Sequence, residues 1–358
     1  MTEVLRVDPA NPDASAIARA AECLRAGGLV AFPTETVYGL GAHALDRRAV
    51  QRVFTAKGRP ANDPLIVHVA AVDDVTSLVA EFPAIARELA ERFWPGPLTM
   101  VLPKTKHVPE EVTAGLGTVA VRIPSHAVAR ALLHYANLPI AAPSANRFSH
   151  PSPTRAAHVL ADLDGRIDIV LDGGPTTVGL ESTVVDLAHN PPTVLRPGAI
   201  DLAALREVMS GVTSRSAMIG RAAAAMPSPG MLGRHYSPAT PLLLFEGERA
   251  GALVQLIHAA QCEVDRGRTV GVLAFTGDRK ELRTAAVRVI ELGDEQDPPR
   301  VAARLYAALR EGDELGVDVL LVRNITSRHP LSTAIQDRLR RAATSPTAVA
   351  LPPDDAVP

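Results

Sequence analysis

The sequence predicts an α/β protein made of two domains, and three observations lead to this expectation. The chain has 358 residues, which is the length of two ordinary domains. Segments with helical periodicity alternate with apolar, strand-like segments along most of the chain. Residues 211–240 show neither pattern, and thirty residues without regular structure are too many for an ordinary connection. We therefore expect one domain before this stretch and another after it.

The first part of the chain predicts a twisted mixed sheet with helical cover. Asp13 and Ser15 can cap a helix whose apolar positions follow helical spacing, and Gly27 and Gly28 end it. Further helices are expected at 46–56, 84–93, 127–135, 154–163 and from 201 onward. Strands are expected at 29–32, 65–69, 98–102, 119–123, 139–142, 167–171, 182–186 and 193–195. Because several of these strands follow one another directly, the sheet should be mixed rather than purely parallel.

The last third of the chain predicts a smaller parallel sheet. Continuous Val- and Leu-rich strands alternate there with helices, as in doubly wound, Rossmann-like domains. The expected strands are 242–245, 270–275, 287–292 and 317–322, and the expected helices are 250–262, 300–310 and 331–343. The predicted organisation is a first domain at 1–210, a linker at 211–241, a second domain at 242–345 and a Pro-rich tail at 346–358.

The composition argues against several classes of protein. The 37 basic and 39 acidic side chains give a net charge of −2, which disfavours a general nucleic-acid binder. Cys23 and Cys262 are the only cysteines and lie far apart, so neither a thiolate zinc site nor a disulfide framework is expected. No apolar run approaches the roughly 20 residues that span a membrane, and the polar N-terminus lacks a signal-peptide core. We expect a cytoplasmic protein without a membrane partner.

Cationic side chains, rather than a glycine-rich phosphate loop, are the candidates for anion binding. The chain has no P-loop motif, and Gly39-Leu-Gly41 lacks the third glycine of the dinucleotide fingerprint. Lys57 and Arg59 stand where a helix is expected to end. With Gly58 and Pro60 pinning the backbone, the two cations could converge on one anion. The alternative is that they only complement the helix dipole.

Arg122 is the second unusual cation, because it lies in an otherwise apolar strand. Charged side chains are rarely buried unless they are paired. Arg122 should therefore lie at a sheet edge or hold an anion. A ligand carboxylate and an internal Asp or Glu are equal alternatives for that anion.

Small and hydroxyl-bearing residues gather where strands are expected to end, which is where open α/β sheets bind ligands. They occur in 33–39, 141–154 and 179–183, and Arg196 lies at one more strand end. A helix cap at Ser152 or Thr154 is a further interpretation of the second segment. Together these residues indicate a polyanion site where charge and positioning, rather than a side-chain nucleophile, do the chemistry.

Several motifs occur in order along the chain: Pro33-Thr-Glu-Thr-Val-Tyr-Gly-Leu-Gly41, Lys57-Gly-Arg-Pro60, Pro64-Leu-Ile-Val-His68, Trp94-Pro-Gly-Pro-Leu-Thr99, Ala142-Pro-Ser-Ala-Asn146 and Glu181-Ser-Thr183. They resemble the YrdC-like domain of L-threonylcarbamoyladenylate synthases, whose hallmarks are the Lys-x-Arg and Ser-x-Asn pairs. The run 227–238, followed by an α/β unit, resembles the long, two-domain form of that family. The resemblance spans nearly the whole chain.

The resemblance implies a nucleotidyltransferase that condenses ATP, L-threonine and bicarbonate or CO2 into threonylcarbamoyl-AMP and pyrophosphate, with Mg²⁺ accompanying ATP. The product would supply N6-threonylcarbamoyladenosine at adenosine 37 of tRNAs reading ANN codons. A downstream threonylcarbamoyl transferase complex would complete that modification, with tRNA bound only indirectly or weakly.

The resemblance also implies the residues of the site, and it assigns none of them as a metal ligand. The threonine contacts would be Thr36, His68, Arg122, Ala142 and Ser182. The ATP contacts would be Lys57, Arg59, Asn62, Thr118, Ser144, Asn146, Ser152, Arg196, His235 and Tyr236. Lys57 and Arg59 are in addition the expected catalytic residues, and the linker would fold over the site.

Three other functions were weighed. An RNA-binding module is disfavoured by the net charge and by the small number of aromatic residues, twelve in all. A carbamoyltransferase of the hydrogenase-maturation type is disfavoured because that class carries Cys-rich zinc fingers. A non-catalytic nucleotide-binding regulator, with the C-terminal domain as its working part, stays open as an alternative.

Overall fold

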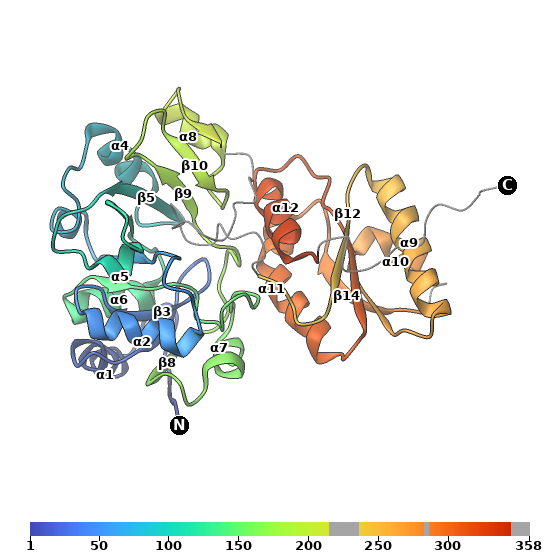
Figure 1. Cartoon of the computed structure of the whole chain (residues 1–358), viewed down its shortest axis with the longest axis horizontal. Coiled ribbons are helices and arrows are strands. Elements are labelled where there is room, and N and C mark those ends of the chain that lie inside the picture. Colours follow the sequence, from blue (N-terminus) through green and yellow to red (C-terminus); the bar gives the residue numbers. More distant parts are fainter. Residues whose placement is uncertain (215–235, 283–285, 345–358) are drawn as a thin grey trace.

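The computed structural model shows two lobes and describes residues 1–214, 236–282 and 286–344 (Figure 1). The first lobe contains an eleven-stranded mixed sheet, and the second a four-stranded parallel sheet. The predicted fold class is therefore confirmed. Most of the expected linker, with His235, and the whole of the expected tail lie outside the described residues. Among the helices of the described part, none is long and apolar enough to cross a membrane.

The first sheet has the spatial order β1-β8-β2-β3-β7-β4-β6-β5-β9-β10-β11. Its strands are β1 (Glu3–Arg6), β2 (Val30–Pro33), β3 (Tyr38–His43), β4 (Ile66–His68), β5 (Leu98–Pro103), β6 (Thr118–Arg122), β7 (Ile140–Ala141), β8 (Ile169–Asp172), β9 (Thr183–Asp186), β10 (Thr193–Arg196) and β11 (Thr213–Ser214). Parallel and antiparallel pairs alternate irregularly along it; β4 and β6, for example, are parallel while β5 and β6 are antiparallel. The strands β4 and β6, which carry candidate site residues, lie in the interior of the sheet.

Helices cover both faces of this sheet. They are α1 (Ala14–Arg25), α2 (Arg47–Lys57), α3 (Val72–Val75), α4 (Ala84–Phe93), α5 (Glu110–Thr113), α6 (Ala127–Ala136), α7 (Ala156–Leu163) and α8 (Leu202–Val208). Val30 and Phe32 of β2 pack with α1 and α6, whereas Ala31 between them packs with α2 and α7. Asp13 caps α1 as expected, because its carboxylate accepts from the backbone N–H groups of Ser15 and Ala16.

The expected elements do not include the strands β1, β3 and β11 or the short helices α3 and α5. In β3 the glycines explain the omission, since glycine is depleted in strands. At Gly41 a Cβ atom would lie 2.8 Å from Phe32 Cε1 and 2.9 Å from Ile140 Cγ2. Close packing between strands therefore requires glycine at this position.

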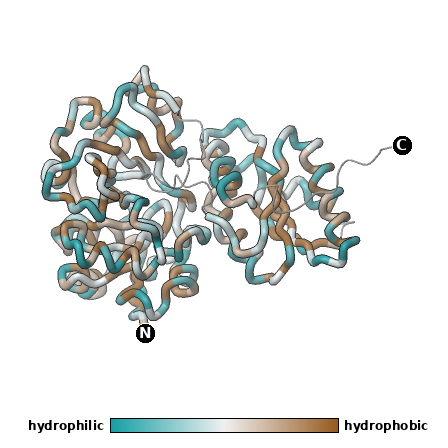
Figure 2. The backbone as a smooth tube through the Cα atoms, in the orientation of Figure 1, coloured by the Kyte–Doolittle hydropathy of each residue, from teal (hydrophilic) through white to brown (hydrophobic). Residues whose placement is uncertain are grey.

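The second lobe is built around the parallel order β12-β15-β13-β14. Its elements are β12 (Leu242–Phe245), α9 (Arg249–Asp265), β13 (Val270–Phe275), the 3₁₀ helix η1 (Thr276–Asp278), α10 (Arg279–Leu282), β14 (Arg288–Gly293), α11 (Pro298–Glu314), β15 (Val319–Arg323) and α12 (Leu331–Ala342). Val272 and Ala274 pack with α9, while Leu273 and Phe275 pack with α11 and α12. In Figure 2 these strands form a hydrophobic band between helices that carry hydrophilic segments.

The helices α11 and α12 lie between the second sheet and the first lobe (Figure 1). The hydrophobic core on this side of the second sheet also includes Val37, Leu180 and Tyr236. The packing between the lobes is therefore continuous with the core of the second one. Next to it, the backbone of Gly179 approaches α11 so closely that a Cβ atom would lie 2.3 Å from Ala303 Cα.

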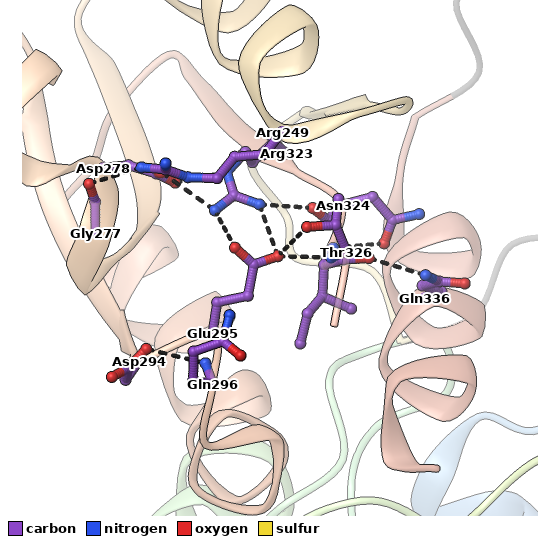
Figure 3. A network of polar contacts seen from close by, with 11 residues as sticks. Arg249, Gly277, Asp278, Asp294, Glu295, Gln296, Arg323, Asn324, Thr326 and Gln336 are labelled. Atoms are coloured by element: carbon purple, nitrogen blue, oxygen red, sulfur yellow. Dashed lines mark hydrogen bonds and ion pairs between the residues drawn. The ribbon is translucent and has the colours of Figure 1, made fainter. Parts of the chain in front are cut away.

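A buried ion network occupies the C-terminal ends of three strands of the second sheet (Figure 3). Arg323, the last residue of β15, donates to both carboxylate oxygens of Asp278 at 2.6 and 3.1 Å and to those of Glu295 at 3.0 and 2.7 Å. Its guanidinium also lies 4.4 Å from the centre of the Phe275 ring. Arg249 adds a contact of 3.1 Å to Asp278.

Candidate active site

A hollow in the first lobe brings together many of the expected site residues. Its empty volume is about 490 Å³, including the part open to solvent. All the residues expected to contact threonine line it: Thr36, His68, Arg122, Ala142 and Ser182. Of the residues expected to contact ATP, the lining includes Arg59, Ser144, Arg196 and Tyr236. Three guanidinium groups thus face one hollow.

The remaining expected ATP contacts lie outside this lining. Asn146 donates to the carbonyls of Arg147 and His150, at 2.6 and 3.0 Å. Thr118 begins β6, at the end of the strand opposite Arg122. The others are Lys57, which lies beside the hollow, Asn62 in the loop between α2 and β4, and Ser152 next to Glu181.

Arg122 occupies the end of an interior strand, which excludes a sheet edge. Its guanidinium forms a 2.7 Å ion pair with Glu35 and donates to Thr36 Oγ1 at 3.0 Å and to the Gly96 carbonyl at 3.2 Å. Burial would raise the pKa of Glu35, but the ion pair outweighs it and the pKa is lowered. An internal carboxylate is therefore present, while Arg122 still lines the hollow.

His68, at the end of β4, contributes a neutral imidazole. Burial, reinforced by the charge of Arg122, lowers its pKa to about 3. The ring meets Phe32 edge-on at 6.3 Å between centroids. Within the described part of the chain, its buried Nδ1 has no hydrogen-bond partner. His68 can therefore offer hydrogen bonds to a ligand without adding charge.

Replacing His68 with Asn should reduce the loss of stability on acidification. The unfolded chain takes up a proton below about pH 6.5 that the folded protein rejects, at about 1.4 kcal/mol per pH unit. His68 therefore costs no stability above pH 6.5 and progressively more as the pH falls towards 3. Urea unfolding at pH 7 and pH 5 should show the wild type losing about 2 kcal/mol more than His68→Asn. Equal losses would contradict this assignment.

The Lys57–Arg59 pair separates at the end of α2. Gly58 has a φ of 63°, which lets the chain turn sharply after Lys57. Lys57 Nζ donates to the carbonyls of Ser144 and Asn146, both at 2.5 Å. Burial, with a smaller effect of Arg59, places the pKa of Lys57 well below its usual value. Lys57 thus fastens the 144–146 turn, one wall of the hollow.

Arg59 reaches the hollow itself and is held by the loop that follows it. Its guanidinium forms a 2.9 Å ion pair with Asp63 and donates to the carbonyls of Asp63 and Pro64 at 3.1 and 2.7 Å. Burial lowers the pKa of Arg59, and Asp63 opposes that effect. The loop thereby fixes the direction of the guanidinium.

Ser182 and Arg196 form a further wall. Ser182 Oγ lies 2.8 Å from Thr99 Oγ1, and Arg196 donates to the Ser182 carbonyl and hydroxyl, each at 3.1 Å. Arg196 ends β10, which pairs with β9 directly after Ser182. Backbone pairing thus positions a hydroxyl and a cation at the same point.

Glu181 is a member of a quoted motif to which the sequence analysis assigned no role. Its carboxylate accepts from Ser152 Oγ at 2.5 Å, from Arg338 Nε at 2.8 Å and from the hydroxyl of Tyr306, which lies 2.9 and 3.1 Å from its two oxygens. Burial opposes ionisation, yet Arg338 and Arg196 lower the pKa of Glu181 to about 2. Tyr306 and Arg338 come from the C-terminal domain, and the sequence analysis missed both.

The described part of the site offers few side chains that could bind a metal ion directly. Among the described residues there is no group of three or more His, Cys, Asp or Glu side chains that could hold one. The nearby carboxylates of Glu35, Asp63 and Glu181 each pair with an arginine instead. A Mg²⁺ ion bound here would have to take most of its ligands from waters and phosphate oxygens rather than from these carboxylates.

Comparison with known families accounts for both lobes. A model described as "Telomere recombination" matches residues 22–198, and one described as "Threonylcarbamoyl-AMP synthase, C-terminal domain" matches residues 200–344. A threonylcarbamoyl-AMP synthase of Pyrococcus abyssi is 44% identical over 90% of this chain and 93% of its own. The chain belongs to the threonylcarbamoyl-AMP synthase family. A synthase of Bacillus subtilis is likewise 44% identical, over 91% of this chain and 92% of its own.

The three-dimensional structure also resembles that of a solved member of the threonylcarbamoyl-AMP synthase family. The crystal structure of P. abyssi Sua5 complexed with L-threonine has a TM-score of 0.89 and 43% identity, covering 96% of this chain and 98% of that one. The resemblance that the motifs indicated is therefore confirmed over both domains. A hydrogenase-maturation carbamoyltransferase is no longer an alternative.

Proposed function

We propose that this chain is an L-threonylcarbamoyladenylate synthase, which makes threonylcarbamoyl-AMP and pyrophosphate from L-threonine, bicarbonate or CO2, and ATP. The observation that carries the proposal is the convergence of Arg59, Arg122 and Arg196 on one hollow lined with hydroxyl groups. Such a site suits an amino-acid carboxylate together with a triphosphate, because guanidinium groups bind both bidentately. The names of the family's members support the same activity.

L-Threonine would occupy the Arg122 end of the hollow. Arg122 would hold its carboxylate, with the hydroxyls of Thr36 and Ser182 beside it. The methyl side chain of Ala142 leaves room, and His68 Nδ1 is available as a neutral hydrogen-bonding group. The P. abyssi relative was crystallised in complex with L-threonine, which supports threonine as the ligand.

ATP would extend from the same hollow past Arg59 and Arg196, which would neutralise its phosphates. Lys57 would act on the phosphates through the 144–146 turn that it fastens. The further contacts we propose are Asn62, Thr118, Ser144, Asn146, Ser152, Tyr236 and His235. Tyr236 has a φ of 64° and is buried at the hollow. Mg²⁺ bound to the phosphates would supply further charge neutralisation.

The reaction needs no covalent bond to the protein. The threonine amine adds to CO2 and loses a proton to solvent, which gives a carbamate. A carbamate oxygen then bonds to the α-phosphorus of ATP while the bond to the β-phosphate oxygen breaks, and pyrophosphate leaves. The side chains hold the two reactants together and neutralise charge, which are the main sources of catalysis in phosphoryl-type transfers.

We further propose that the product passes to a threonylcarbamoyl transferase complex that modifies adenosine 37 of tRNAs reading ANN codons. The net charge of −2 supports only indirect or weak contact with tRNA. A native pull-down with tRNA at low and physiological salt would test that part.

The main experiment measures pyrophosphate release from ATP and bicarbonate with and without L-threonine. Release should require threonine, and mass spectrometry should identify threonylcarbamoyl-AMP. Release that is independent of threonine, or no release at all, would reject the proposed function.

Replacing Glu35 with Gln should lower the melting temperature and make it more responsive to threonine. The variant leaves the buried Arg122 guanidinium without its carboxylate, which costs about 3–5 kcal/mol. Threonine would restore a carboxylate at that point. Thermal melts should therefore show a larger upward shift with L-threonine in Glu35→Gln than in the wild type. L-Threoninamide, which lacks the carboxylate, is the control ligand, and an equal shift with both would contradict the prediction.

A further inference from the structure

The Glu181 carboxylate joins the active site to the C-terminal domain. It lines the hollow, together with Arg59 and Arg196. Two of its partners, Arg338 on α12 and Tyr306 on α11, lie 125 residues or more away along the chain. Glu181 is therefore a point at which the C-terminal domain can influence the active site.

Arg338 and Tyr306 are built to hold it. Both side chains are fully buried, so neither reaches solvent or the hollow. Arg338 also donates to the carbonyl of Pro197, next to Arg196, at 3.0 Å, and pairs with Asp337. The Tyr306 ring packs against Tyr236 at 5.5 Å between centroids. These contacts leave the carboxylate little freedom to turn.

The charge of Glu181 matters because ATP is a polyanion. An ionised carboxylate in the wall of a phosphate site repels the phosphates and competes for the cations that bind them. Arg338 compensates that charge from behind the wall, and the hydroxyls of Tyr306 and Ser152 satisfy the remaining lone pairs. With its charge compensated in this way, Glu181 no longer opposes Arg59 and Arg196, the cations that line the hollow beside it.

We propose that Arg338 and Tyr306 are positioning residues of the C-terminal domain, which hold and neutralise Glu181 so that the hollow accepts the phosphates of ATP. This inference rests on the proposed function. It assigns the C-terminal domain a part in nucleotide affinity through two side chains that lie outside the lining of the hollow and act by way of Glu181.

The test separates KM from kcat in the full-length chain. Arg338→Gln should raise the KM for ATP roughly tenfold, since it exposes one negative charge to the phosphates, while kcat changes by less than about twofold. Glu181→Gln combined with Arg338→Gln removes both charges and should return KM to within about threefold of the wild type. Arg340→Gln, an exposed arginine on the same helix, is the matched control and should leave KM unchanged.

Tyr306→Phe is a milder variant that keeps the ring packing and should raise the KM for ATP about threefold. Circular dichroism and thermal melts establish that each variant is folded. A folded Arg338→Gln with unchanged KM, or a double variant no closer to the wild type than the single one, would overturn the inference. Wild-type turnover tests the proposed function separately, so the two failures are distinguishable.

Discussion

Replacing Arg122 with Gln should reduce kcat/KM for threonine about 10²- to 10³-fold in the pyrophosphate-release assay. The variant removes the cation that we propose holds the threonine carboxylate and leaves Glu35 buried and negative in its place. Losing one partner of a buried, hydrogen-bonded charge pair costs about 3–4 kcal/mol of binding, which corresponds to that loss. The KM for threonine should rise more than the KM for ATP, because Arg59 and Arg196 are untouched.

Two further variants make this result interpretable. In Glu35→Gln with Arg122→Gln no unpaired charge is left, so the protein should regain stability and still lack threonine-dependent activity. Arg19→Gln removes an exposed arginine whose partner is Glu3 and should behave as the wild type. If the double variant recovered activity, a role of Arg122 in threonine binding would be refuted.

Replacing Gly179 with Ala should weaken the packing between the two lobes and abolish most activity. The new Cβ would lie 2.3 Å from Ala303 Cα and 2.6 Å from the Ala302 carbonyl, both backbone atoms of α11 that cannot move aside. The φ of 78° adds strain for any residue with a side chain. Because Glu181 follows two residues later, displacing this segment would also move it away from Arg338.

Gly174→Ala is the matched control for that variant. Gly174 has nearly the same φ, 79°, but among the described residues nothing lies within 4 Å of a Cβ there. Gly174→Ala should therefore lose only the stability that backbone strain costs, about 1–2 kcal/mol. Thermal melts and pyrophosphate release should show Gly179→Ala far more damaged than Gly174→Ala. Similar effects would mean that contact with α11 contributes little.

The regular elements could be predicted where local signals agree. Asp13 precedes a helix with apolar residues at helical spacing, and the Val- and Leu-rich strands of the second sheet form continuous runs. The strand β3 could not be predicted, because its Gly41 is required by the close approach of Phe32 and Ile140 on other strands. Local propensity carries no information about such neighbours.

The candidate site divides in the same way. The motifs predicted that Thr36, His68, Arg122 and Ser182 belong together, and the structure gathers them in one hollow. No local pattern could have indicated Arg338 as the partner of Glu181, since that pair depends on how two domains pack. One signal was present: Arg338 lies in the apolar stripe of α12 between buried neighbours such as Ile335 and Leu339.

The ion network at the second sheet shows that a ligand site cannot be predicted from the architecture of the domain alone (Figure 3). Doubly wound domains commonly bind their ligand outside the carboxyl ends of the strands. In this domain Arg323 occupies the ends of the strands, and its guanidinium donates its hydrogen bonds to Asp278 and Glu295. A nucleotide could bind to the Arg323 guanidinium at this position only after the ion pairs with Asp278 and Glu295 had been broken. A doubly wound fold therefore does not by itself imply a ligand site at the ends of its strands, because in this domain that position is filled by ion pairs.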